Sequence, residues 1–172
     1  VKDIRHPIVY PEIFLGVEIS CADKCHVVGI FDNNVDNKSA IRKWLNDNLF
    51  NIEQGSFKTS LDVLHFIYSL SGIGYIAHIN SSNIFDKNFL SNAYKNNLLE
   101  QVDIIGLSDI TQKDNIDKKL HGFKNGNNIK YILDNDSHDI DNIVKKAFWI
   151  KANKSSFTML KQSFQDYDVS FS

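Results

Sequence analysis

Five side chains of the kind that bind metal ions in proteins stand inside or beside apolar runs. Glu18 lies within I-F-L-G-V-E-I-S, His26 begins H-V-V-G-I-F, and His78 ends G-Y-I-A-H. Asp136 and His138 follow the apolar run Y-I-L and are two residues apart, so an extended backbone points both to one side. Imidazole and carboxylate ligands together suit zinc, manganese or iron, and a carboxylate can bridge two ions. The residues therefore predict a divalent-metal site.

Each of these residues also has a simpler interpretation. A single histidine is more often a core side chain bonded to a carbonyl, and D-x-H alone is more often a polar turn after a strand. Glu18 is harder to dismiss, because a carboxylate buried among apolar residues is costly unless it is paired or binds a cation. Five such residues beside strand ends favour the metal site. A cysteine nucleophile is less attractive, because neither Cys21 nor Cys25 has an evident Asp or Asn to orient a base.

The elements that must position these side chains follow from the apolar patterns. Strands are predicted at Ile13–Ser20, His26–Phe31, Gly74–His78, Val102–Leu107, Ile129–Leu133 and Phe148–Lys151. Helices are predicted at Ser39–Phe50, Ser60–Ser71 and Ser91–Gln101 and from Ser155 or Ser156 to Phe164, with Asn33–Lys38 as a polar loop. Strands and helices in alternation are typical of a largely parallel sheet or barrel covered by helices. In such folds, functional side chains converge at the carboxyl ends of the strands.

Composition narrows the class of protein. The 172 residues suit one domain, residues 1–172, and the net charge of −2 argues against nucleic-acid binding by charge alone. The sequence contains no apolar run of transmembrane length, no signal-peptide layout, no P-loop and no dinucleotide fingerprint. We therefore expect a cytoplasmic protein that does not enter a membrane. Two cysteines are too few for a disulfide framework, so free thiols are expected.

The order and separation of four motifs resemble the PHP (polymerase and histidinol phosphatase) phosphoesterases. The motifs are G-V-E-I-S, H-V-V-G-I-F, G-I-G-Y-I-A-H and D-N-D-S-H. The ending F-W-I-K-A-N-K-S-S-F-T-M-L-K-Q-S-F-Q-D resembles the subgroup in which a PHP domain precedes an SMC-like or AAA-like ATPase. This second resemblance implies an ATPase domain or subunit as partner and a nuclease that acts in defence against phage.

The resemblance implies a distorted (β/α)7 TIM-like barrel with up to three metal ions at the carboxyl ends of its strands. Glu18 would bridge the first and second ions, and His26 and His78 would complete the protein ligands of the second. Asp136 would bind the first ion and His138 the third. With Glu18, Asp136 and His138 as the catalytic set, the implied reaction is hydrolysis of a nucleic-acid phosphodiester by metal-activated water.

One departure from the family pattern concerns the N-terminal ligands. The family has a His-x-His motif and a later Asp-His pair upstream of the Gly-x-Glu motif. In this chain, the residues before Gly16 include a single histidine, His6, and neither motif. We therefore expect a barrel that is incomplete at its N-terminus, in which only the second metal site is complete. Either the chain begins partway through the domain or the site is reduced. Two alternatives stay open: a small-molecule phosphomonoesterase, as in histidinol-phosphate hydrolysis, and a metal-free scaffold that docks a partner.

Overall fold

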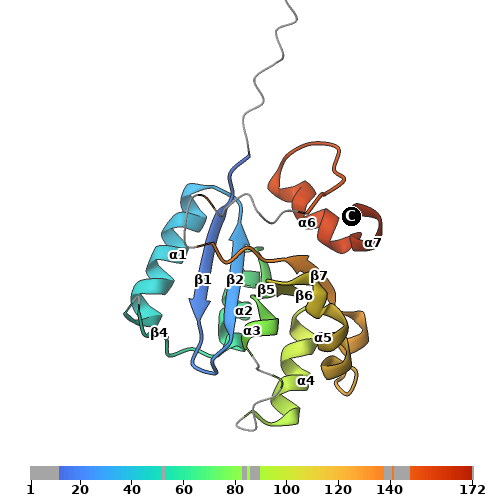
Figure 1. The fold of residues 1–172 in the computed structure, drawn as a ribbon. Coiled ribbons are helices and arrows are strands. Elements are labelled where there is room, and N and C mark those ends of the chain that lie inside the picture. Colours follow the sequence, from blue (N-terminus) through green and yellow to red (C-terminus); the bar gives the residue numbers. More distant parts are fainter. Residues whose placement is uncertain are drawn as a thin grey trace, which may run out of the picture.

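The structure is a computed structural model, and it describes residues 12–51, 53–82, 85, 90–137, 141 and 148–171 (Figure 1). Its centre is a five-stranded sheet in the order β1-β2-β5-β6-β7. These strands are β1 (Leu15–Ser20), β2 (His26–Phe31), β5 (Ile73–Ile76), β6 (Ile104–Leu107) and β7 (Lys130–Leu133).

Strand direction decides which residues meet at each edge of the sheet. β2 is antiparallel to both β1 and β5, whereas β5, β6 and β7 are parallel to one another. It follows that β1, β5, β6 and β7 run in one direction and end at a common edge. β2 runs the opposite way and begins at that edge, with His26 as its first residue.

Helices and a small hairpin connect the strands. The helices are α1 (Val35–Asn48), α2 (Ser60–Ser69), α3 (Ile79–Ser82), α4 (Asn92–Gln101), α5 (Lys113–Leu120), α6 (Phe157–Gln165) and α7 (Tyr167–Ser170), with short 3-10 turns η2 (Ile110–Gln112) and η3 (Gly126–Asn128). The hairpin pairs β3 (Leu49–Asn51) with β4 (Gly55–Ser56). Side-chain caps mark the starts of four helices: Asn34, Thr59, Ser91 and Ser156 each accept a backbone N–H of the first turn.

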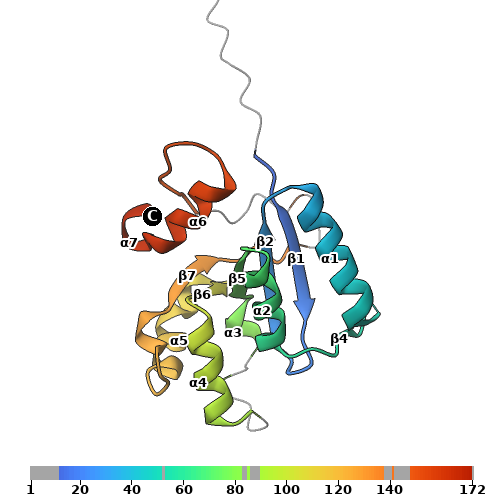
Figure 2. The ribbon, with the colours of Figure 1, turned by 180° about the vertical axis from the view of Figure 1, so that it is seen from behind.

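The two faces of the sheet carry different layers. α1, α2 and α4 cover one face, where Val27, Phe31 and Ile105 pack against Leu64 and other helical side chains (Figure 2). On the opposite face, Phe164 of α6 joins a second apolar cluster that includes Tyr75, Ile104 and Ile132. Alternation along the strands places Glu18, whose register partner on β2 is Val28, on this second face.

Most of the predicted elements are present, with differences at particular places. The predicted polar loop Asn33–Lys38 is wrong, because Asn34 caps a helix that already begins at Val35. The predicted strand Phe148–Lys151 is also wrong: Ile150 makes a single isolated bridge, to Phe171.

The prediction of a barrel needs correction. In the part of the chain that the structure describes, the main sheet is open, with β1 and β7 at its two ends, and it contains an antiparallel hairpin beside the parallel strands. A mixed α/β fold is therefore confirmed, whereas a closed seven-stranded barrel is not formed by these residues. Among the described helices, none combines the length and apolar character that spanning a bilayer requires.

Candidate metal centre

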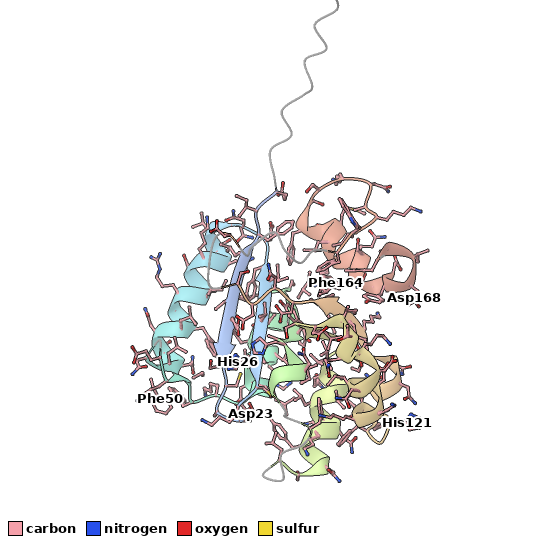
Figure 3. All side chains as sticks on the ribbon, in the orientation of Figure 1. Asp23, His26, Phe50, His121, Phe164 and Asp168 are labelled. Carbon is pink, nitrogen blue, oxygen red and sulfur yellow. The ribbon has the colours of Figure 1, made fainter. Side chains whose placement is uncertain are left out.

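Three of the predicted ligands meet at the common edge of the sheet. Glu18 comes from β1, His26 from the start of β2, and His78 from the segment just after β5. One ligand atom from each of them lies within 4.8 Å of the other two. Figure 3 labels His26 at the lower end of β2 and Asp23 in the turn below it. The chain thus brings together residues 8 and 60 positions apart.

The carboxylate stands between the two imidazoles. His26 Nδ1 lies 2.9 Å from Glu18 Oε1, and His78 Nε2 lies 3.2 Å from the same oxygen. The imidazole rings meet edge to face, with their centroids 4.8 Å apart. The side chains of Glu18 and His26 are 41% and 38% exposed, whereas that of His78 is only 10% exposed. The site therefore has a buried floor at His78 and an open side toward solvent.

Hydrogen bonding perturbs the protonation of two of these groups. The hydrogen bond from His78 lowers the pKa of Glu18, although partial burial opposes that change. The same bond raises the pKa of His78, again against the effect of burial, with smaller contributions from the charges of Glu18, Asp134 and Asp136. In the metal-free protein, carboxylate and imidazolium thus stabilise each other. A metal ion that binds here must displace the proton from His78.

The backbone of His78 is in an unusual conformation. Its φ of +29° lies in the left-handed region, which costs a non-glycine residue about 1–3 kcal/mol. The His78 N–H donates to Asp134 Oδ2 at 2.8 Å, and the preceding N–H, of Ala77, donates to the carbonyl of His26 at 2.9 Å. Asp134 follows β7 directly, and burial raises the pKa of its carboxyl group. Two hydrogen bonds therefore hold the segment that presents the His78 ring.

The turn that joins Glu18 to His26 is also tightly held. The Cys21 N–H donates to the Cys25 carbonyl at 2.8 Å, and the Ala22 N–H donates to the Lys58 carbonyl at 2.9 Å. Both cysteines are free and buried, as expected, and burial raises the pKa of the Cys21 thiol. Such a thiol is a poor nucleophile, so Cys21 is better suited to packing the turn than to reaction.

The donor set fits a divalent transition metal. In a tetrahedral zinc site, ligand atoms about 2.0–2.1 Å from the ion are about 3.3 Å from one another. The two distances at Glu18 Oε1, 2.9 and 3.2 Å, are close to that spacing, and all three ligand atoms lie within 4.8 Å of one another. A site with three protein ligands leaves a coordination position for water or substrate, which is the pattern of catalytic and not of structural sites.

The two remaining predicted ligands are Asp136 and His138. Asp136 is exposed and lies outside the group of three, but its charge contributes to the raised pKa of His78, so it lies near the site. His138 lies outside the described residues. Sequence reasoning missed Asp134 as a contact of His78. Its position as the first charged residue after an apolar strand could have marked Asp134 as a candidate, but not its contact with the His78 backbone.

Comparison with known proteins gives a fold but no family. No family model matches the chain. An uncharacterized protein of Streptococcus pneumoniae serotype 4 is 37% identical over 100 residues, which are 56% of this chain and 38% of that protein. Protein TIC 214 of Phaseolus vulgaris is 33% identical over 100 residues, 58% of this chain and 5% of that protein. The chain thus spans well under half the length of these curated relatives.

Two solved structures share the fold. The lesion-specific endonuclease Q from Pyrococcus furiosus aligns with a TM-score of 0.65 and 13% identity, over 88% of this chain and 38% of that chain. Endonuclease Q in complex with a 27-mer duplex substrate, which carries an abasic lesion at the active site, aligns with a TM-score of 0.63 and 13% identity over the same shares. The arrangement of strands and helices described above therefore recurs in part of a DNA endonuclease.

Proposed function

We propose that this chain carries the metal centre of a PHP-type phosphoesterase that hydrolyses nucleic-acid phosphodiesters. One observation carries the proposal: Glu18, His26 and His78 converge within 4.8 Å although they come from β1, from β2 and from the segment after β5. The resemblance of the motifs to PHP enzymes and the fold shared with endonuclease Q support it independently. A barrel like that of the PHP family would require strands beyond the open sheet of the described residues.

The roles of the residues follow from their chemistry. Glu18, His26 and His78 would hold one divalent ion, with manganese, zinc and iron as the candidates. Asp136 and His138 would serve further ions, as the motif resemblance implies. In this class of reaction, bound divalent ions supply Lewis acidity and a hydroxide nucleophile near neutral pH. His78 must be neutral to act as a ligand, and Glu18, held as the carboxylate, supplies negative charge.

The exposure of the site favours a polymeric substrate over a small ester. Glu18 and His26 are more than one-third exposed at the common edge of the sheet. Small-molecule sites are concave and bury most of their ligand, whereas an extended backbone can lie along an exposed edge. The ending that resembles ATPase-linked members of the family leads us to include an ATPase partner and a role in phage defence in the proposal. The cytoplasmic location expected from the sequence is kept as part of it.

The test is hydrolysis of DNA and RNA by metal-loaded protein, measured alongside metal content by elemental mass spectrometry. We expect activity that chelators abolish and that Glu18→Gln removes, with Glu53→Gln, an exposed glutamate on the β3–β4 hairpin, as the matched control. Turnover of a phosphomonoester without cleavage of either polymer would support the small-molecule alternative. Metal-free protein that stays metal-free after incubation with manganese or zinc would support the scaffold alternative.

A further inference from the structure

The position of the His78 ring depends on a backbone conformation that needs an external support. His78 is not a glycine, yet its φ is +29°. In the left-handed region the Cβ of an L-residue crowds its own backbone, so the residue returns to an ordinary conformation unless its surroundings hold it. His78 is buried and its Nε2 lies 3.2 Å from Glu18 Oε1. A change in this backbone would therefore move a metal ligand.

The carboxylate of Asp134 supplies such a support from 56 residues away. Its Oδ2 accepts the His78 N–H at 2.8 Å. The Asp134 backbone is itself fixed, because its N–H donates to the Leu107 carbonyl at 2.8 Å and so extends the β6–β7 pairing by one residue. Asp134 does not belong to the group of three ligands. Its hydrogen bond to His78 is made to the backbone N–H and not to the imidazole.

A glycine on the neighbouring strand leaves the space that this carboxylate fills. A Cβ added to Gly106 would lie 2.7 Å from Asp134 Oδ2, 2.9 Å from its Cβ and 3.1 Å from its Cγ, all tighter than ordinary contacts. Only the Asp134 side chain provides the nearest atoms. Gly106 therefore has a specific steric partner, and the partner is the residue that bonds to His78.

We propose that Asp134 is a positioning residue of the metal centre: it holds His78 in the left-handed conformation, and Gly106 is required because it makes room for the Asp134 carboxylate. This inference deepens the proposed function and, in its effect on metal affinity, rests on it. Removing a residue that orients a metal ligand in this way typically lowers metal affinity by about 10–100-fold.

The experiment compares metal affinity and the state of the His78 ring in one set of variants. Co²⁺ binding is measured by visible absorption, which also reports coordination geometry, and the His78 imidazole is observed by ¹⁵N NMR in the metal-free protein. We expect Asp134→Ala and Gly106→Ala each to weaken Co²⁺ binding by about 10–100-fold and to shift the imidazole resonances. Asp134→Asn keeps an oxygen acceptor and should retain most of the affinity. Gly122→Ala, where nothing lies within 4 Å of the added Cβ, is the control.

The double variant Asp134→Ala/Gly106→Ala distinguishes a specific contact between the two residues from a general loss of structure. If Gly106 acts through the Asp134 carboxylate, most of the loss caused by Gly106→Ala should be absent in the Asp134→Ala background. The Oδ2 and Cγ atoms that the added Cβ would meet are then gone, and only the Cβ of residue 134, at 2.9 Å, remains. The inference would be overturned if the losses of Co²⁺ affinity in the two single variants added up in the double variant. It would also be overturned if Asp134→Ala left both the Co²⁺ affinity and the imidazole spectrum unchanged. Failure of the unmodified protein to bind Co²⁺, Mn²⁺ or Zn²⁺ would instead overturn the proposed function. The imidazole spectra of the metal-free variants would then decide the positioning role alone.

Discussion

Asp23 accepts two hydrogen bonds from Ser60, one from its backbone N–H at 3.0 Å and one from its hydroxyl at 2.6 Å, and so ties the β1–β2 turn to the start of α2. The phenol of Tyr94 on α4 donates to the same carboxylate oxygen. Burial and the hydrogen bond to Asp23 raise the pKa of Tyr94 to about 12. This turn carries the chain from Glu18 to His26, so one buried carboxylate fixes the turn between two candidate ligands to the helical layer.

Replacing Asp23 by alanine should destabilise the protein strongly. The change leaves the buried Ser60 backbone N–H without its acceptor, and the Ser60 and Tyr94 hydroxyl groups lose the carboxylate but keep each other, at 3.1 Å. Each unsatisfied buried group costs about 1–3 kcal/mol. We expect the free energy of unfolding in urea to fall by about 2–3 kcal/mol or more. Asp47→Ala, which removes an exposed carboxylate paired with Lys43 within α1, should have little effect. Equal losses in the two variants would show that the Asp23 network is not stabilising.

A divalent metal should raise the thermal stability of the folded protein. An ion that binds only the folded state at 100 times its Kd stabilises it by about 2.7 kcal/mol, which for a chain of this size raises Tm by about 5–10 °C. Differential scanning calorimetry with and without Mn²⁺ or Zn²⁺ measures this shift. Glu18→Gln should abolish the shift and Glu53→Gln should leave it intact. A shift of equal size in Glu18→Gln would mean that the ion binds elsewhere.

The start of α2 should show a pH-dependent contribution to stability. Thr59 and Asp62 form a reciprocal capping box, and the hydrogen bond from the Thr59 side chain lowers the pKa of Asp62. A group whose pKa is lowered in the folded state stabilises it above the unfolded pKa, which is 3.8 for Asp62. That stabilisation is lost as the pH falls through the folded pKa.

The variant Thr59→Ala tests this dependence. We expect it to lower the free energy of unfolding by about 0.5 kcal/mol near neutral pH, a small value because Asp62 is exposed and screened. The difference from the unmodified protein should shrink below about pH 4, and a ¹³C titration should show the Asp62 pKa rising toward its ordinary value in the variant. A difference that stays constant from neutral to acidic pH would contradict the capping role of the carboxylate.

Glycine at position 24 should stabilise the protein without disturbing the site. Lys24 is exposed in the β1–β2 turn and has a φ of +64°, a conformation that glycine adopts without strain. Lys24→Gly should raise the free energy of unfolding by about 0.5–1 kcal/mol, whereas Lys24→Ala removes the same charge but keeps the Cβ and should not. Chemical denaturation of the three proteins provides the comparison. A gain of the same size in the alanine variant would assign the effect to the charge.

The sequence predicted the bounds of strands and helices better than it predicted the relative directions of the strands. The bounds of β2 and the helix that follows Ser91 agree with the structure, because apolar period and capping residues are local signals. An apolar run has no mark of its own direction, and the parallel sheet was expected from the alternation of strands and helices. The five residues between Ser20 and His26 are too few for a parallel crossover, so the antiparallel β1–β2 hairpin could have been predicted from the length of that connection. The start of α1 was missed because its first turn is polar and exposed, as in a loop.

The candidate site likewise includes residues that the sequence predicted and one that it did not. Glu18, His26 and His78 were predicted from residue type and motif, and the structure brings them together. Asp134 was not predicted, because its contact depends on the left-handed backbone of His78 and on the empty space above Gly106. Both are properties of the packed sheet, and neither leaves a pattern in the residues around them.

The separation of the ligands along the chain has a consequence for folding. An ion held by Glu18 and His78 would act as a cross-link that closes a loop of 60 residues, in the way that a disulfide does. The loop contains α1, α2 and the β3–β4 hairpin, so these elements would lose conformational freedom in any partly unfolded state that kept the ion. A disulfide stays closed in the unfolded chain, whereas the ion is released when its ligands separate. Any affinity that the ion kept for partly unfolded states would therefore reduce, and not increase, the stabilisation that it provides.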